Sequence, residues 1–164
     1  MSKIESIVIH CSDSDFGTAI DIDRWHRAKK WDRIGYMGVI LNGWVKPGMY
    51  WDQSNGAWEW GRPLDQDNQI ETGEVEAHAL GWNHKSVGIC LIGKKSFTYK
   101  QMQTLCWWIT DLRKMWDIPV EKILGHYEVD KAGKTCPNIN MDLFRHLFVS
   151  GEKGENVWKS LNQA

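Results

Sequence analysis

The stretch "IESIVIHCS" (residues 4–12) is rich in Ile and Val, and its residues alternate well enough to predict a strand over residues 4–10. His10 stands at the end of this strand, where a side chain can project from the rim of a sheet. Neighbouring residues of a strand point to opposite faces. Cys11 is therefore expected to face away from any group that His10 faces.

Strands and helices alternate along the remainder of the chain. Apolar residues recur at helical spacing over residues 98–116, where Thr98 is a candidate N-cap, and Thr18 or Asp21 is a candidate cap for an earlier helix. Asn-Gly occurs twice and Pro-Gly once in residues 42–64, which predicts hairpins. Strands are expected over residues 34–41, 74–80 and 86–93, a short strand or extended loop over 122–129, and helices over 19–31, 98–116 and, as the final helix, 140–148. This order predicts an α/β fold in which a single mixed β-sheet is flanked by helices.

Length and composition are those of one globular domain. The chain has 164 residues, 42% hydrophobic and 25% charged, so we expect a soluble protein with one domain over residues 1–164. The formal net charge of −1 gives no electrostatic reason to expect nucleic acid or an anionic membrane as a partner. No apolar run approaches the ~20 residues that span a bilayer, and the first residues lack a secretory signal. Synthesis in the cytosol, with export by another route, is therefore expected.

The four cysteines are expected to remain thiols in a cytosolic chain, although they are enough for two disulfides. Cys90 and Cys106 lie inside apolar segments, and we interpret both as core residues.

The stretch "GHYEVDKAGKTCPN" (residues 125–138) places reactive side chains in a loop-like segment. It has three interpretations: a metal site, a nucleophile with its base, or a turn that happens to hold such residues. His126 and Cys136 flank a loop that can curl back, and His10 could join them in a two-His, one-Cys zinc site with one open position. The spacing alone is a weak signal, since a buried His, a surface His and a core Cys would give the same pattern.

Several motifs together resemble a known family. The pieces are "IVIHCSDS", "IGYMGVI", "GRPLDQD", "EAHALGWNHKSVGICLIG" and "GHYEVDKAGKTCPN", in that order, and they cover roughly residues 4–148, which leaves a short C-terminal extension. In this combination the chain resembles the zinc-dependent N-acetylmuramoyl-L-alanine amidases of type 2, which include small phage endolysins and the peptidoglycan recognition proteins. The resemblance implies Zn2+ on His10, His126 and Cys136, with the Cys ligand typical of the endolysin branch.

The resemblance also implies catalytic residues. The expected substrate is the amide between N-acetylmuramic acid and L-alanine in peptidoglycan. Lys134 is expected to stabilise the oxyanion, and Tyr36 to help hold the attacking water or the substrate carbonyl. The family often has a His soon after this Tyr, whereas Met37 and Gly38 follow it here, which weakens any claim for a second base on this strand.

Other residues are candidates for substrate binding. His78 matches a His of the groove wall and is expected to bind substrate or assist proton transfer, with a structural role as the alternative. Asn83 and His84 are expected to touch the stem peptide, whereas His26 and His146 are interpreted as surface or packing residues. The chain has 11 Trp, and the Trp-rich residues 44–60 form either a sugar- or peptide-stacking wall or, as we favour, a hairpin pinned to the sheet by aromatics.

The expected biological role is host lysis by a phage endolysin that is a monomer and stays in the cytoplasm until its release to the periplasm and cell wall. Three alternatives remain open: a peptidoglycan-binding protein without catalysis, a protein that binds and regulates an RNA polymerase, and a cell-wall recycling amidase. Receptors of this family typically lack the Cys ligand, whereas this chain retains Cys136.

Overall fold

A computed structural model describes residues 1–65, 67–130 and 133–163. Residue 66 in the "GRPLDQD" motif, residues 131 and 132 in the "GHYEVDKAGKTCPN" motif, and residue 164 lie outside this description. Among the described residues, no helix combines the length and the apolar character needed to cross a membrane.

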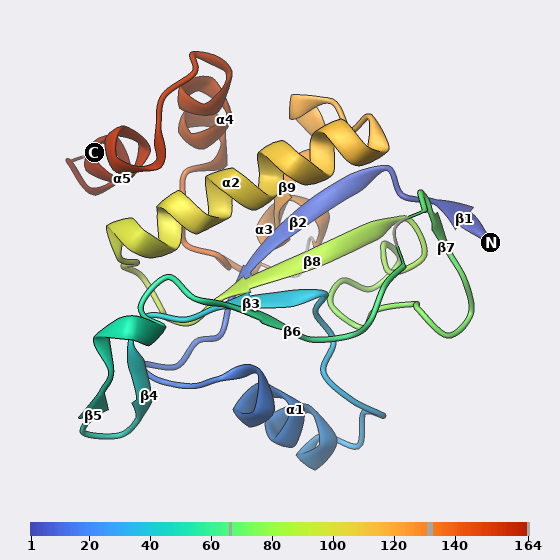
Figure 1. Ribbon diagram of the computed structural model, residues 1–164. Helices are drawn as coiled ribbons and strands as arrows, with labels where there is room; N and C mark the ends of the chain where they lie inside the picture. Colours follow the sequence, from blue (N-terminus) through green and yellow to red (C-terminus); the bar gives the residue numbers. More distant parts are fainter. Residues whose placement is uncertain (66, 131–132, 164) are drawn as a thin grey trace.

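A five-stranded sheet forms the centre of the molecule (Figure 1). Its strands in spatial order are β6 (Trp58–Trp60), β3 (Gly38–Ile40), β8 (Ser86–Leu91), β2 (Ser6–Cys11) and β9 (Ile123–Gly125). The last four are parallel to one another, and β6 pairs antiparallel with β3. Two small antiparallel pairs lie outside this sheet: β1 (Ser2–Lys3) with β7 (Gln69–Ile70), and β4 (Trp44–Lys46) with β5 (Met49–Tyr50). The predicted mixed sheet is confirmed.

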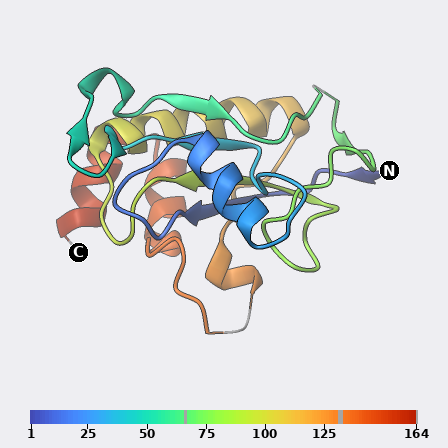
Figure 2. The same ribbon diagram turned by 90° about the horizontal axis from the view of Figure 1, so that it is seen from below.

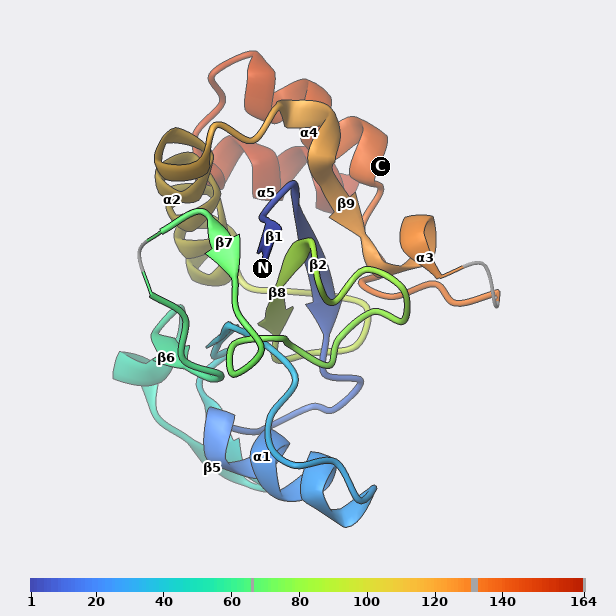
Figure 3. The same ribbon diagram turned by 90° about the vertical axis from the view of Figure 1, so that its right-hand side faces the viewer.

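Helices cover both faces of the sheet, as the side view in Figure 3 shows. One face carries α2 (Tyr99–Trp116), α4 (Met141–Val149) and α5 (Gly154–Gln163), whereas α1 (Ala19–Ala28) lies on the other face and is seen in front of the sheet in Figure 2. The short helix α3 (His126–Val129) directly follows β9, and two 3-10 turns occupy Asp52–Ser54 and Val120–Lys122.

Capping boxes define where the two helices next to the sheet begin. Thr18 and Asp21 exchange side chain–backbone hydrogen bonds at the start of α1, and Thr98 and Gln101 do the same at the start of α2. The amide of Gln101 is buried and donates to the carbonyls of Ile40 and Ile92, 3.0 and 2.9 Å away. It thereby ties the start of α2 to the ends of β3 and β8.

Alternation along the strands separates two hydrophobic clusters. Ile7, Ile9 and Cys11 of β2 face the larger cluster, which includes Leu105 and Ile109 of α2. The smaller cluster on the other face joins residues of β3 and β8 to α1, and its members are Ala19, Ile22, Ile34, Val39, Leu41, Cys90 and Ile92. Cys90 and Cys106 are buried, which confirms their interpretation as core residues.

The expected strand over residues 74–80 is wrong, because the segment folds as turns and loop. Side chains take the place of a partner strand: Arg62 donates to the carbonyl of Val75, and Asn83 accepts from the backbone N–H groups of His78 and Ala79. The strand expected over residues 34–41 is shorter for the same reason, since the Ile34 carbonyl accepts from the Arg62 side chain.

The expectation that the helix over residues 140–148 is the final one is also wrong. Helix α5 follows it and packs on α2, with Val157 fully buried and the Trp158 indole donating to the carbonyl of Phe97 at 2.7 Å. The helix expected over residues 19–31 ends at Ala28, because Lys30 adopts a positive φ of 66°.

The Trp-rich segment forms the β4–β5 hairpin and the edge strand β6. Trp58 stacks on Trp108 of α2 with ring centroids 4.1 Å apart, which holds β6 against that helix. Trp51 and Trp60 are exposed. The hairpin is confirmed, and a sugar-stacking role for this segment stays a prediction.

The contrast between two isoleucines on helices tests the packing of α2. Ile109 is fully buried, whereas Ile20 on α1 is 64% exposed. We expect Ile109→Ala to lower the free energy of unfolding by about 2–5 kcal/mol, since it removes buried methyl groups and leaves a cavity. Ile20→Ala should change it by less than about 0.5 kcal/mol. Urea unfolding of both variants measures the difference, and equal losses would contradict the described packing.

Candidate metal centre

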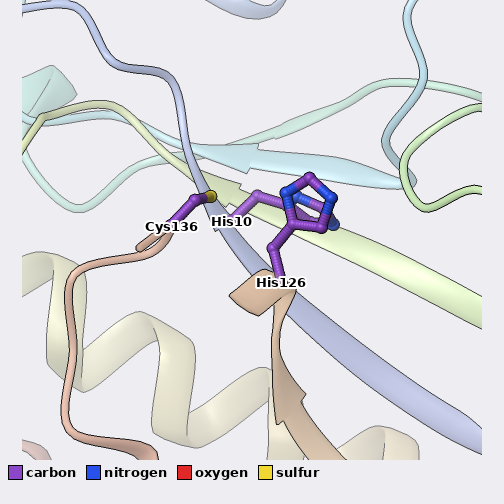
Figure 4. A group of neighbouring side chains, drawn as sticks. All are labelled: His10, His126 and Cys136. Atoms are coloured by element: carbon purple, nitrogen blue, oxygen red, sulfur yellow. The ribbon is translucent and has the colours of Figure 1, made fainter. Parts of the chain in front are cut away.

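His10, His126 and Cys136 converge at the end of β2 (Figure 4). The parallel register pairs Ile9 with Gly125, so the next residue of each segment, His10 and His126, reaches the same rim. Their ring centroids are 4.5 Å apart. Cys136 comes from the following loop, whose base is closed by the hydrogen bond from the Tyr127 N–H to the Cys136 carbonyl at 2.8 Å.

The three side chains fit a metal ion. One ligand atom from each lies within 4.8 Å of the other two. Zinc bonds of about 2.0–2.3 Å in a tetrahedron place ligand atoms roughly 3.3–3.8 Å apart, so small rotations of these side chains would close the site. Two imidazoles and one thiolate leave the fourth position open, which is the arrangement of a catalytic rather than a structural site.

Burial keeps the two imidazoles neutral, as metal ligation requires. The pKa of His10 is held well below its ordinary value, first by burial and then by the neighbouring His78 and His126. The pKa of His126 is lowered by burial and by the charge of Lys134. Both rings therefore carry a free lone pair near neutral pH.

Cys11 lies close to Cys136 even though it belongs to the opposite face. Its side chain joins the core cluster on the α2 side, as alternation predicts, and it is not part of the three-ligand group among the described residues. The Cys11 N–H nevertheless points at the Cys136 sulfur, 3.2 Å away. A hydrogen bond with the Cys136 thiol lowers the pKa of Cys11 to about 7, against the opposing effect of burial.

Tyr36 lies beside the ligands. Its ring centroid is 5.0 Å from that of His10 and 5.4 Å from that of His26. Burial, more than the nearby Cys90, Cys136 and Cys11 thiols, raises its pKa well above the ordinary value. The hydroxyl therefore remains protonated and can donate a hydrogen bond at neutral pH.

Lys134 lies at the open side of the site, with 49% of its side chain exposed. Its ammonium pairs with the Asp130 carboxylate at 2.7 Å, and the same carboxylate oxygen is 3.6 Å from His126 Nε2. Sequence reasoning missed Asp130. Its spacing was the available signal, because it stands four residues after His126 and four before Lys134.

His78 lies behind His10 and is buried, and the half-buried Asn83 holds the backbone beside it. The His78 side chain is fully buried, and its Nδ1 is 2.9 Å from His10 Nε2. Asn83 Oδ1 accepts from the backbone N–H groups of His78 and Ala79 at 3.0 and 2.8 Å, which orients His78. His84 in the same turn is exposed. Their predicted contacts with substrate stay predictions.

A cavity of about 330 Å³ opens onto the ligands, and Tyr36, His78, Lys134 and both His126 and Cys136 line it. Trp25, His26 and Trp31 form another part of its wall. His26 is a buried packing residue, as expected: its Nδ1 accepts from the Gly35 N–H at 2.9 Å, and burial lowers its pKa to about 4. Its place beside the site was missed, since only the packing of α1 on the sheet brings it there.

Comparison with known proteins identifies the family. The family model described as N-acetylmuramoyl-L-alanine amidase matches residues 1–139. The chain belongs to this family. Membership confirms the resemblance noted in the sequence, and it makes the chain an enzyme that hydrolyses an amide bond.

Phage proteins are among its relatives. The chain is 30% identical to the endolysin of Klebsiella phage KP32, over 85% of this chain and 83% of that protein. It is 28% identical to the endolysin of Escherichia phage T7, over 92% of each.

Solved structures of amidases and recognition proteins share the fold. The N-acetylmuramoyl-L-alanine amidase LysC from Clostridium intestinale URNW superposes with a TM-score of 0.70 at 23% identity, covering 93% of this chain and 88% of that one. Drosophila PGRP-LB gives a TM-score of 0.62 at 24% identity, covering 84% and 76%. Both likenesses confirm the predicted amidase-like fold.

The two neighbouring cysteines allow a matched test of the metal centre. Cys136→Ser should weaken Zn2+ binding by more than about 100-fold, the upper end of what changes outside the ligand set usually cause. Cys11→Ser should retain most of the affinity, because the contact from its backbone N–H to Cys136 is preserved. Competition with a chromophoric chelator measures both affinities, and a larger loss in Cys11→Ser would remove Cys136 from the ligand set.

Proposed function

We propose that the chain is a zinc-dependent amidase that cleaves the bond between N-acetylmuramic acid and L-alanine in peptidoglycan, with Zn2+ held by His10, His126 and Cys136. The observation that carries the proposal is the convergence of these three side chains beside a cavity that His126, Cys136, Tyr36 and Lys134 line, in a member of the amidase family. When bound, zinc supplies a Lewis acid that polarises the scissile carbonyl and makes water a stronger nucleophile.

Lys134 acts on the charge that develops during the reaction. Attack of water on the amide carbon converts the carbonyl oxygen into an oxyanion, which needs a nearby positive charge or hydrogen-bond donors. The Lys134 ammonium is at the open side of the cavity, and its pairing with Asp130 restricts where it can reach. A protonated ammonium cannot ligate a metal, so Lys134 belongs to the reaction and not to the ligand set.

Tyr36 supplies a second polar group. Its hydroxyl remains protonated because burial raises its pKa, and its ring packs against that of His10. It can donate a hydrogen bond to the substrate carbonyl or orient the attacking water. Together, Lys134 and Tyr36 stabilise the reacting oxygen from the protein side.

We infer a role in phage lysis from the relatives, which are endolysins of phages. The substrate would then be the peptidoglycan of an infected cell, reached after release from the cytoplasm. Solved relatives include a Drosophila PGRP-LB variant in complex with tracheal cytotoxin, which supports a peptidoglycan-type ligand for this fold. An RNA polymerase partner, a recycling role and the monomeric state stay predictions.

Digestion of purified sacculi tests the function. The protein should release new L-alanine amino termini and leave the glycan strands uncut, and chelation should abolish the release. Mass spectrometry of the products and an assay for reducing ends measure both bonds. New reducing sugar ends in place of amino termini would make the enzyme a glycosidase and overturn the proposal.

Replacement of Lys134 separates catalysis from metal binding. We expect Lys134→Ala to keep zinc but to lower the turnover of sacculi by about 10²–10³-fold, since it removes one group that stabilises the oxyanion. Tyr36→Phe should act in the same direction. Lys114→Ala, which removes an exposed lysine on α2, is the control and should keep full activity. Zinc content and amino-terminus release are measured on the same preparations, and full activity in Lys134→Ala would remove Lys134 from the mechanism.

A further inference from the structure

Residues 71–85 cover part of the sheet face that carries His10, and they bury a carboxyl group there. The Glu76 side chain is only 1% exposed. Its Oε2 accepts from the Gly88 N–H at 2.6 Å, whereas Oε1 has no hydrogen-bond partner among the described residues. A buried carboxyl with one unpaired oxygen is costly to the fold, so its presence needs a reason.

Glu76 and His78 approach the sheet at Gly88 of β8. A Cβ atom on Gly88 would lie 2.8 Å from His78 Cγ and 3.1 Å from Glu76 Oε2. Both contacts are shorter than ordinary packing allows, so the absence of a side chain at this position lets the two groups reach the strand. Glu76 Oε2 is 3.6 Å from His78 Nε2, which is an electrostatic contact rather than a hydrogen bond.

The neighbours of His78 define which of its nitrogens carries the proton. His78 Nε2 lies 3.3 Å from the Ser86 carbonyl and 3.2 Å from the Ser86 hydroxyl, whose own hydrogen is donated to the Trp82 carbonyl. The oxygens of Ser86 are therefore the acceptors that face Nε2. Glu76 Oε2 lies beyond hydrogen-bond distance and contributes the partial negative charge of its oxygen. The hydrogen-bond network therefore assigns the proton of His78 to Nε2 and leaves Nδ1 as an acceptor.

The tautomer of His78 determines the tautomer of His10, the proposed ligand. His78 Nδ1 is 2.9 Å from His10 Nε2, so His10 must donate its Nε2–H to it. The lone pair of His10 Nδ1 is then left free for a metal ion. Ligating histidines commonly donate their other N–H to a carboxylate or carbonyl that sets the tautomer. Here the imidazole of His78 lies between His10 and the acceptor oxygens of Ser86.

We propose that Glu76 is a positioning residue of the metal centre: its buried oxygen, through His78, helps to hold His10 in the tautomer that leaves Nδ1 free for the metal. The inference deepens the proposed function, since it depends on His10 being a zinc ligand. It also gives His78 a role behind His10, in place of direct contact with substrate.

Three variants test the role of the Glu76 oxygen. Glu76→Leu removes the oxygen that faces His78 Nε2 at similar size, and Glu76→Gln keeps an oxygen there, because the Gly88 N–H directs the amide oxygen to the Oε2 position. Glu71→Leu makes the same change at an exposed position of the same segment and is the control. For each variant, Zn2+ affinity is measured by chelator competition, the visible spectrum is recorded with Co2+ in place of Zn2+, and thermal unfolding of the metal-free protein is followed.

The expected result is a loss of about tenfold in Zn2+ affinity for Glu76→Leu with an altered Co2+ spectrum. Glu76→Gln and Glu71→Leu should remain within about threefold of the native protein. A merely structural Glu76 would give Glu76→Leu a lower unfolding temperature with native Zn2+ affinity, which overturns the proposal. Equal losses in Glu76→Gln and Glu76→Leu also overturn it, since the oxygen at the Oε2 position would not be the cause.

A measurement on the native protein tests the tautomers on which the proposal depends, even if Glu76→Leu fails to fold. Long-range ¹H–¹⁵N correlation spectra of the metal-free protein distinguish the two tautomers of a neutral histidine. The proposal expects both His78 and His10 to be protonated on Nε2, and a His78 protonated on Nδ1 overturns it. If the native protein binds no Zn2+, the proposed function fails, whereas native binding with a native-like Glu76→Leu rejects the positioning role alone.

Discussion

The parallel register of β9, β2 and β8 is the constraint on which the site depends. It pairs Ile9 with Gly125 and His10 with Cys90, so His10 and His126 reach the same rim of the sheet and Tyr36 packs beside them. A slip of one residue would turn His10 into the cluster under α2 and bring Cys11 to the cavity face, because strand side chains alternate. The apolar pattern that fixes the register for packing therefore also selects the side chains that meet at the cavity.

The candidate site has a buried part and a part that is exposed to solvent. His10 and His78 are 1% and 7% exposed, and burial is the largest cause of the lowered pKa of each. These imidazoles are consequently neutral and fixed by hydrogen bonds before any metal arrives. The Lys134–Asp130 ion pair lies at the open side of the site, where 49% of the lysine side chain is exposed. A substrate that enters the proposed site from this side would meet the ion pair before the candidate ligands.

The sequence predicted those helices and strands whose hydrophobic pattern and capping residues all lie within one short segment. β2, β8 and α2 were recoverable from alternation, helical spacing and the Thr98 cap. The segment "EVEAHAL" alternates like a strand, but a distant side chain, Arg62, forms a hydrogen bond with its backbone in place of a neighbouring strand. The sequence of the segment itself gives no sign of this contact. Helix α5 was missed because only Gly154 and Val157 of it are buried, and their partners in α2 and α4 are distant in the sequence or lie on another helix. The candidate ligands were identified through motif order, whereas Asp130, His26 and Glu76 acquire their places only through packing.

Cys11 and Cys136 show what the alternation of side chains along a strand can predict and what it cannot. Alternation correctly placed the Cys11 side chain on the core face. It could not predict the distance to Cys136, because Cys136 comes from the loop between α3 and α4, which approaches the end of β2 only in the folded chain. The hydrogen bond with the Cys136 thiol lowers the pKa of Cys11. In the proposed centre it is nevertheless Cys136 that ligates, since both imidazoles project on its side of the strand. Geometry therefore favours Cys136 over Cys11 as the sulfur ligand of the proposed centre.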